Sequence, residues 1–150
     1  MSLTSQRIGA TNGADNMILQ SLTGLPVFLA YFCTAFVAVI FYLLVYTRIT
    51  PHDEFALIRN NVPGAAIALG LSLLGFALPV ASVIAHTENL VDCMIWSLIA
   101  LIVQVIVYFV VRIPIPNLPQ RIAAGDLAPA IWLGSASLAA GALSAASISY

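Results

Sequence analysis

The chain has 150 residues, of which 61% are hydrophobic and 7% are charged. A soluble domain carries about 25% charged residues, so these charges are too few to cover a surface that faces water. The composition therefore predicts a protein embedded in a lipid bilayer. The net charge of −1 provides no basic field for nucleic acid, and a chain of this length that crosses a membrane several times has no room for a separate catalytic domain.

The first segment, residues 1–24, is polar and rich in Gly, Ser, Thr and Asn, and we expect it to form a tail outside the membrane. Ile18, Leu22 and Leu25 follow the i, i+4, i+7 spacing of a short amphipathic helix on the membrane surface. A disordered tail fits the same residues equally well. The remaining residues, 25–150, predict an all-α membrane domain.

Four apolar stretches in this domain are each close to the ~20 residues that a helix needs to cross a bilayer. They cover residues 25–47, 62–85, 91–111 and 127–148. Gln104 is the polar side chain placed deepest within a span. It lies about 12 Å along the helix from Arg112, and therefore within the hydrocarbon.

Between the first two spans lies a polar elbow, residues 48–61. Thr50, Pro51 and Asp53 resemble a capping box, with Thr50 as the N-cap and Asp53 reaching back to it. They predict a short interfacial helix from Pro51 to about Asn60. A second elbow, residues 112–126, is richer in proline and lacks the acidic pair that follows Pro51 in the first.

Small residues recur at helical spacing in the second and fourth spans, as in membrane helices that pack closely. Because the fourth span carries more of them than one bundle needs, we expect a homo-oligomer. The predicted packing residues are Gly64, Ala68, Ser72, Gly134, Ser137 and Gly141.

Four of the five basic residues, all arginines, lie in the two elbows. The positive-inside rule then places both elbows in the cytoplasm and both termini outside it. A shift of 64 residues aligns Arg48 with Arg112 and Gly70 with Gly134. We therefore expect two parallel two-helix repeats, at about residues 25–86 and 89–150.

These segments resemble a known family. Residues 49–61 read I-T-P-H-D-E-F-A-L-I-R-N-N, residues 73–79 read L-L-G-F-A-L-P, and residues 98–104 read L-I-A-L-I-V-Q. Together with the small-residue end of the chain, they resemble the YjfL-like family of small bacterial inner-membrane proteins of unknown function. The resemblance implies a multi-pass protein of the inner membrane, an association with envelope stress and a cytoplasmic membrane-stress protein as a partner.

Two sites are candidates for function. In the first elbow, capping requires only Thr50 and Asp53, which leaves polar side chains free to contact a cytoplasmic protein or lipid headgroups. These residues are His52, Glu54, Arg59 and Asn60. Within the membrane, Gln104 either joins two helices or lines a polar path.

Neither site has the spacing of a metal centre, a nucleophile–base pair or a cofactor motif, so we expect no enzyme and no cofactor. The sequence favours a structural or adaptor protein. The alternative is a small transporter or channel subunit with a path near Gln104.

Overall fold

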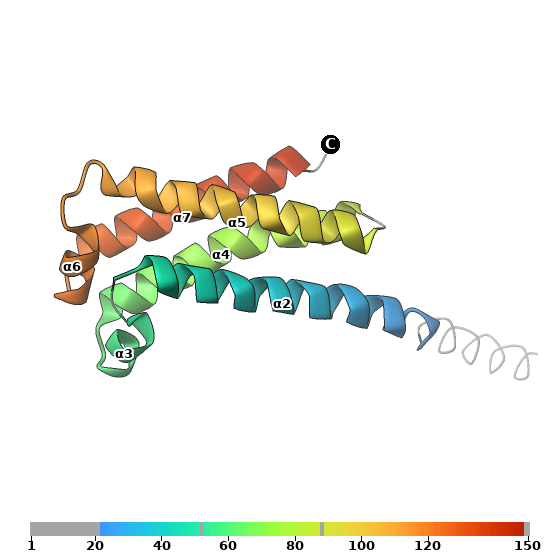
Figure 1. Ribbon diagram of the computed structural model, residues 1–150, viewed down its shortest axis with the longest axis horizontal. Coiled ribbons are helices and arrows are strands. Elements are labelled where there is room, and N and C mark those ends of the chain that lie inside the picture. Colours follow the sequence, from blue (N-terminus) through green and yellow to red (C-terminus); the bar gives the residue numbers. More distant parts are fainter. Residues whose placement is uncertain (1–21, 52, 88, 149–150) are drawn as a thin grey trace, which may run out of the picture. The chain divides into compact units, whose positions relative to one another are not determined.

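The structure is a computed structural model that describes residues 22–51, 53–87 and 89–148. Its labelled helices are α2 (Leu25–Ile49), α3 (Glu54–Arg59), α4 (Pro63–His86), α5 (Leu90–Arg112), α6 (Leu118–Ala123) and α7 (Leu127–Ile148) (Figure 1). Four of them, α2, α4, α5 and α7, are long and apolar enough to cross a membrane. The predicted all-α fold with four spans is confirmed, and the two-repeat relation remains a prediction.

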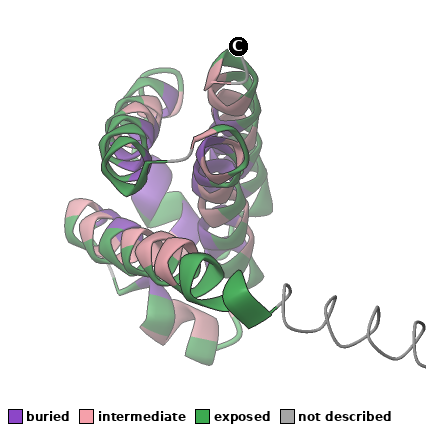
Figure 2. Cartoon of the chain, turned by 90° about the vertical axis from the view of Figure 1, so that its right-hand side faces the viewer, coloured by how far each residue is buried: buried purple, intermediate pink, exposed green. Residues whose placement is uncertain are grey.

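The chain divides into two units, residues 1–33 and 34–150, and the boundary falls within α2. In the described part of the first unit, the rings of Phe28 and Phe32 stack with their centroids 5.7 Å apart. The second unit holds the rest of α2 and all the later helices. There, buried residues lie on the sides of α4, α5 and α7 that face one another, and exposed residues lie on the outer sides (Figure 2).

Helices α4 and α7 form the closest pair in this second unit. A Cβ atom added at Gly75 would strike the backbone carbonyl of Ser137, and one added at Gly141 would strike the carbonyl of Gly75. Ser72 Oγ donates to Ser137 Oγ across the same interface, at 3.2 Å. Such direct backbone contact is how helices associate in lipid, where no hydrophobic effect drives them together.

All the predicted packing residues are buried in the second unit: Gly64, Ala68, Ser72, Gly134, Ser137 and Gly141. We expected a homo-oligomer because the fourth span has more small residues than one bundle needs. That reason is wrong, because the small residues of α7 pack against α4 of the same chain.

The two short helices, α3 and α6, lie at the same end of the second unit, which we call the elbow end (Figure 1). Each short helix ends in a Schellman motif. Asn61 and Gly125 take positive φ angles of 57° and 98°, and the next amide, of Val62 or Asp126, donates back to the carbonyl of Leu57 or Arg121. The two motifs are 64 residues apart, the offset that aligned the sequence of the two halves.

The predicted start of the first elbow helix is wrong. Asp53, not Thr50, is the N-cap, and its Oδ1 accepts a hydrogen bond from the Ala56 amide at 3.1 Å. Thr50 instead belongs to the end of α2, because its amide and its hydroxyl both donate to the Tyr46 carbonyl. The elbow helix therefore begins at Glu54, three residues later than predicted.

We predict that Gly141→Leu destabilises the monomer itself, because the new side chain meets the backbone of α4 and cannot be relieved by a change of rotamer. Overpacking of this kind costs about 1–3 kcal/mol or more. Thermal unfolding in detergent, followed by circular dichroism, measures the effect. Gly70→Ala is the matched control, because a Cβ there meets nothing within 4 Å and should leave the melting temperature unchanged or slightly raised. Equal melting curves for wild type and Gly141→Leu would contradict the α4–α7 contact.

Candidate functional site

The carboxyl group of the first elbow lies inside the protein. Glu54 is 4% exposed, and its Oε2 lies within hydrogen-bonding distance of Thr50 Oγ, at 2.8 Å. Arg59, the last residue of the same short helix, and Asn60, its C-cap, are exposed. The prediction that Glu54 shares their exposed face is therefore wrong, while Arg59 and Asn60 are free to meet a partner. His52 lies outside the described residues.

The pKa of Glu54 is raised to about 7, chiefly by burial and to a smaller extent by the neighbouring Asp53 carboxylate, although hydrogen bonds to Thr50 and to the Glu54 backbone oppose the rise. The hydrogen-bond geometry agrees with a neutral carboxyl. Thr50 Oγ lies 2.8 Å from both Glu54 Oε2 and the Tyr46 carbonyl oxygen, but a hydroxyl has one hydrogen to donate. Protonated Glu54 satisfies both contacts, because it donates to Thr50 Oγ while Thr50 donates to Tyr46.

Glu54 faces a small cavity at the centre of the elbow end. Each of the labelled helices, α2 to α7, contributes at least one side chain to the lining of this cavity, and the walls are mostly apolar. Its lining residues are Tyr46, Thr50, Glu54, Ala65, Ala68, Tyr108, Leu118, Pro119, Ile122 and Leu133. Its polar atoms come from α2, α3 and α5 and the α2–α3 junction, whereas α4, α6 and α7 present only apolar side chains to Glu54.

Gln104, the other predicted site residue, is 4% exposed and faces α7. Its Nε2 donates to the Ser137 carbonyl at 3.0 Å, so it does join two helices. Its Oε1 is buried, and within the described residues it has no hydrogen-bond partner. The same holds for the hydroxyl of Tyr108, one helical turn away on α5.

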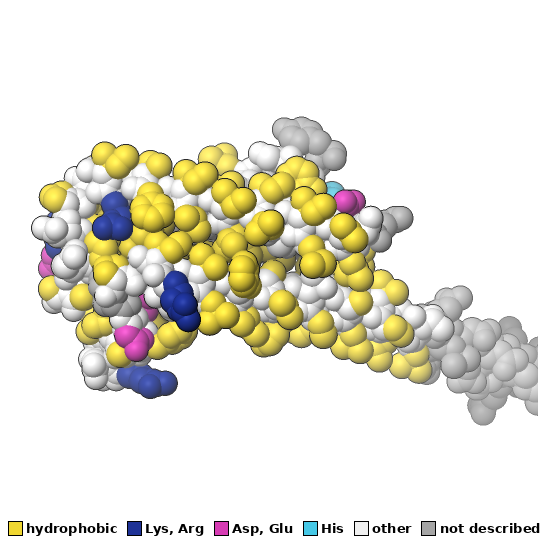
Figure 3. Space-filling view, viewed as in Figure 1, with side chains coloured by type: hydrophobic (Ala, Val, Ile, Leu, Met, Phe, Trp, Pro, Cys, Tyr) yellow, Lys and Arg dark blue, Asp and Glu magenta, His cyan; other side chains and the backbone are white. Residues whose placement is uncertain are grey.

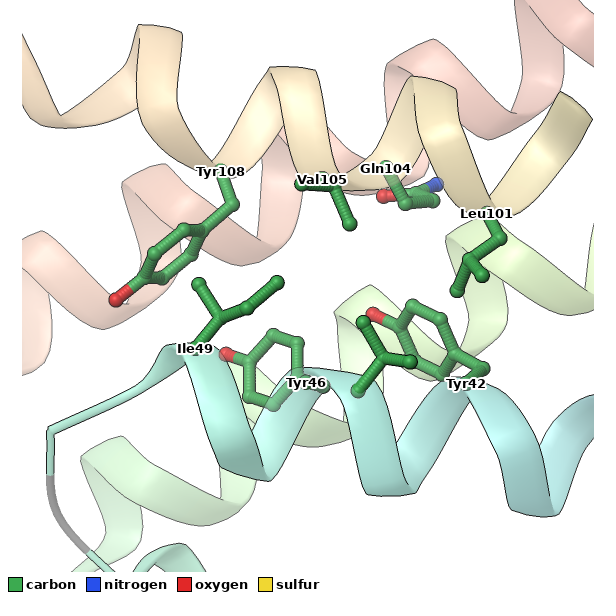
Figure 4. A pocket seen from close by; sticks show the side chains of 8 residues that line it. Tyr42, Tyr46, Ile49, Leu101, Gln104, Val105 and Tyr108 are labelled. Atoms are coloured by element: carbon green, nitrogen blue, oxygen red, sulfur yellow. The ribbon is translucent and has the colours of Figure 1, made fainter.

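Tyr42, Tyr46 and Tyr108 connect the Glu54 cavity with the Gln104 cavity, and Figure 4 shows them around Gln104. Tyr42 stacks on Phe76 with ring centroids 4.6 Å apart, and the rings of Tyr46 and Tyr108 meet edge to face at 6.0 Å.

We call the whole set the polar seam, and it runs from the elbow to the middle of the spans: Glu54, Thr50, Tyr46, Tyr108, Tyr42, Ser72, Ser137 and Gln104. The sequence analysis did not include these tyrosines among the candidate site residues. The usable signal was their spacing. Tyr42, Tyr46, Thr50 and Glu54 follow at intervals of four residues, and so do Gln104 and Tyr108.

The second elbow has an apolar residue at the position that corresponds to Glu54 in the first elbow. Leu118 is the first residue of α6, as Glu54 is of α3, and it is 64 residues further along the chain. It is 1% exposed and lines the same cavity as Glu54. An apolar side chain therefore fills this position in one elbow, and a carboxyl group fills it in the other.

The described residues contain no group of three His, Cys, Asp or Glu side chains that could hold a metal ion. Cys33 is exposed, Cys93 is buried, and both are free thiols. Along the second unit, apolar side chains cover the flanks of the helices, and charged side chains gather toward their ends (Figure 3). These features define a multi-pass helical membrane protein that is surrounded by lipid.

Comparison with known proteins identifies its family. Residues 20–148 match the model of a family described as Domain of Unknown Function (DUF350), and the chain belongs to that family. It is 36% identical over 129 residues to the UPF0719 inner membrane protein YjfL of Escherichia coli K12, and the same values hold for YjfL of Escherichia coli O157:H7. The match covers 86% of this chain and 98% of each relative. No solved structure matches the chain. The predicted YjfL-like family and inner-membrane location are confirmed.

We predict that the protein becomes less stable as the pH rises from about 5 to about 8. The pKa of Glu54 is raised in the folded state, so folding favours its protonated form, and this stabilisation is lost as the pH rises through about 7. The loss can reach a few kcal/mol. Thermal unfolding in detergent across this range measures it, and Glu54→Gln, which stays neutral, should flatten the curve. If wild type and Glu54→Gln show the same pH dependence, another group is responsible.

Proposed function

We propose that this chain is a structural or adaptor protein of the bacterial inner membrane that has no enzymatic activity and presents its first elbow to a partner. The observation that carries the proposal is the firm mounting of α3. Asp53 caps its start, the Asn61 turn closes its end, and Glu54 anchors its inner side. Arg59 and Asn60 are therefore held in place on the exposed side.

Arg59 and Asn60 supply a cation and an amide, a pair that suits an acidic protein surface or lipid phosphates. We take a cytoplasmic membrane-stress protein as the partner, in keeping with the family resemblance. His52 tunes the contact near neutral pH in this proposal. Glu54 contributes from inside, since its charge state changes how firmly α3 is held.

The alternative, a transporter with a path near Gln104, is less well supported. The cavity that Gln104 lines has a volume of about 10 Å³, which is room for one water molecule. At the level of Gln104, α4 and α7 touch backbone to backbone at Gly75 and Gly141. Neither the Gln104 cavity nor the α4–α7 interface has space for a solute larger than water.

The proposed homo-oligomer finds support in α2 rather than in α7. Only 6% of the apolar window of α2 is buried within the chain, against 44% for α4. Large side chains such as Phe36 and Phe41 are more than half exposed on α2, so this helix has a face that a second copy can occupy in place of lipid.

For orientation, we expect both elbows in the cytoplasm and both termini outside it, because Arg48 and Arg112 end their helices at the elbow end. Alkaline phosphatase fused after Tyr150 should therefore be active, and green fluorescent protein fused there should be dark. Fusions placed in the α4–α5 turn should behave like the C-terminal fusions. A fluorescent C-terminal fusion overturns the orientation.

We predict that a photo-crosslinking amino acid at position 59 captures a cytoplasmic protein in cells, and that Asn60→Ala weakens this capture several-fold. The same amino acid at position 120 is the matched control, because Gln120 is exposed on the other elbow helix. At position 36 on α2, the crosslinker should give a band at twice the chain mass. Crosslinks to lipid alone at position 59 would refute the adaptor role, and only monomer at position 36 would refute an α2 interface.

A further inference from the structure

We propose that the polar seam is a binding site for internal water, with one water molecule in each of two cavities, which completes a hydrogen-bonded path from Glu54 at the elbow end to Gln104 in the middle of the spans. The ligand is water itself, and the site lies between α2 and α5. This inference is independent of the proposed adaptor role.

The first observation is a pair of buried polar atoms without partners. Gln104 Oε1 and the Tyr108 hydroxyl have no hydrogen-bond partner among the described residues, and their side chains are 4% and 3% exposed. An unmet hydrogen bond of this kind costs about 1–3 kcal/mol. Both side chains line the cavity between α2 and α5 (Figure 4). A water molecule in this cavity can bond to Gln104 Oε1, and one in the Glu54 cavity, which Tyr108 also lines, can bond to the Tyr108 hydroxyl.

The second observation is the size and position of the cavities. The cavity at Gln104 and the cavity at Glu54 each have a volume of about 10 Å³, close to the minimum that holds one water molecule. Tyr46 and Tyr108 line both cavities. A tyrosine hydroxyl both donates and accepts, so it can bond to water on either side. In the proposed path, the hydroxyl groups of these tyrosines bridge the two waters.

The third observation is the contrast between the two elbows. Leu118 begins α6 as Glu54 begins α3, and its apolar side chain is buried against the same cavity. A buried carboxyl costs free energy unless its hydrogen bonds are met, and Thr50 meets only one side of the group. A water molecule in the Glu54 cavity supplies a second partner. Hydration of the polar seam therefore explains why a carboxyl group is buried at this position, whereas packing requires only an apolar side chain.

Next to Gln104, the Gly75–Gly141 contact closes the space between α4 and α7. The proposed hydrogen-bonded path therefore does not continue between these two helices.

Solid-state nuclear magnetic resonance in lipid bilayers tests the proposal, with glutamine labelled by nitrogen-15 and magnetisation transferred from water to side-chain amides. We expect transfer to Gln104 within the bilayer, as well as to exposed Gln120, which serves as the positive reference. Tyr108→Phe removes one unpartnered group and should lower the Gln104 transfer at least twofold. Val105→Ile adds a methylene at the wall of the same cavity and should also lower it.

Tyr31→Phe is the matched control, because Tyr31 lines neither cavity, and it should leave the Gln104 transfer unchanged. The melting temperature of each variant in the same lipid shows whether it is folded. The proposal is overturned if wild-type Gln104 receives no magnetisation from water while Gln120 does. It is equally overturned if folded Tyr108→Phe and Val105→Ile proteins both keep the wild-type transfer.

Discussion

The contact between the backbones of α4 and α7 is the constraint on which the rest of the second unit depends. Lipid provides no hydrophobic drive for two helices to meet, so their association requires close approach and hydrogen bonds. Gly75 and Gly141 permit the approach, and the Ser72–Ser137 and Gln104–Ser137 hydrogen bonds add polar contacts along the same line. Once α4 and α7 are joined, α5 docks against both, and the tyrosines of α2 close the remaining side.

The two elbows have the same construction but different chemistry. Each is a six-residue helix that ends in the same turn, and each sends its first side chain into a shared cavity. The difference between Glu54 and Leu118 gives the cavity one polar wall and one apolar wall. Glu54 is the only buried acid among the described residues. A buried charge costs free energy, so this environment favours the protonated form of Glu54.

The number of spans and their limits follow from hydropathy alone, because a run of about 20 apolar residues in this composition has few other folds available. The small residues of α4 and α7 were also predictable as packing positions. Their partner was not, because the spacing of Gly134, Ser137 and Gly141 is the same whether the facing helix belongs to this chain or to a second copy. The burial of Glu54 was missed because two residues, Thr50 and Asp53, were both able to cap the elbow helix. Only the turn that follows α2 decides between them.

The composition of α7 also has a consequence for how the protein is made. It is the least apolar of the four spans, because Gly, Ala and Ser replace the Leu, Ile and Phe that fill α2 and α5. A segment of this kind partitions weakly into lipid when it leaves the translocon alone. It also emerges after α4, which is then already in the membrane and offers it a matching groove. The residues that weaken the partitioning of α7 into lipid are the same ones that α4 accepts, so the insertion of α7 is also a step of folding.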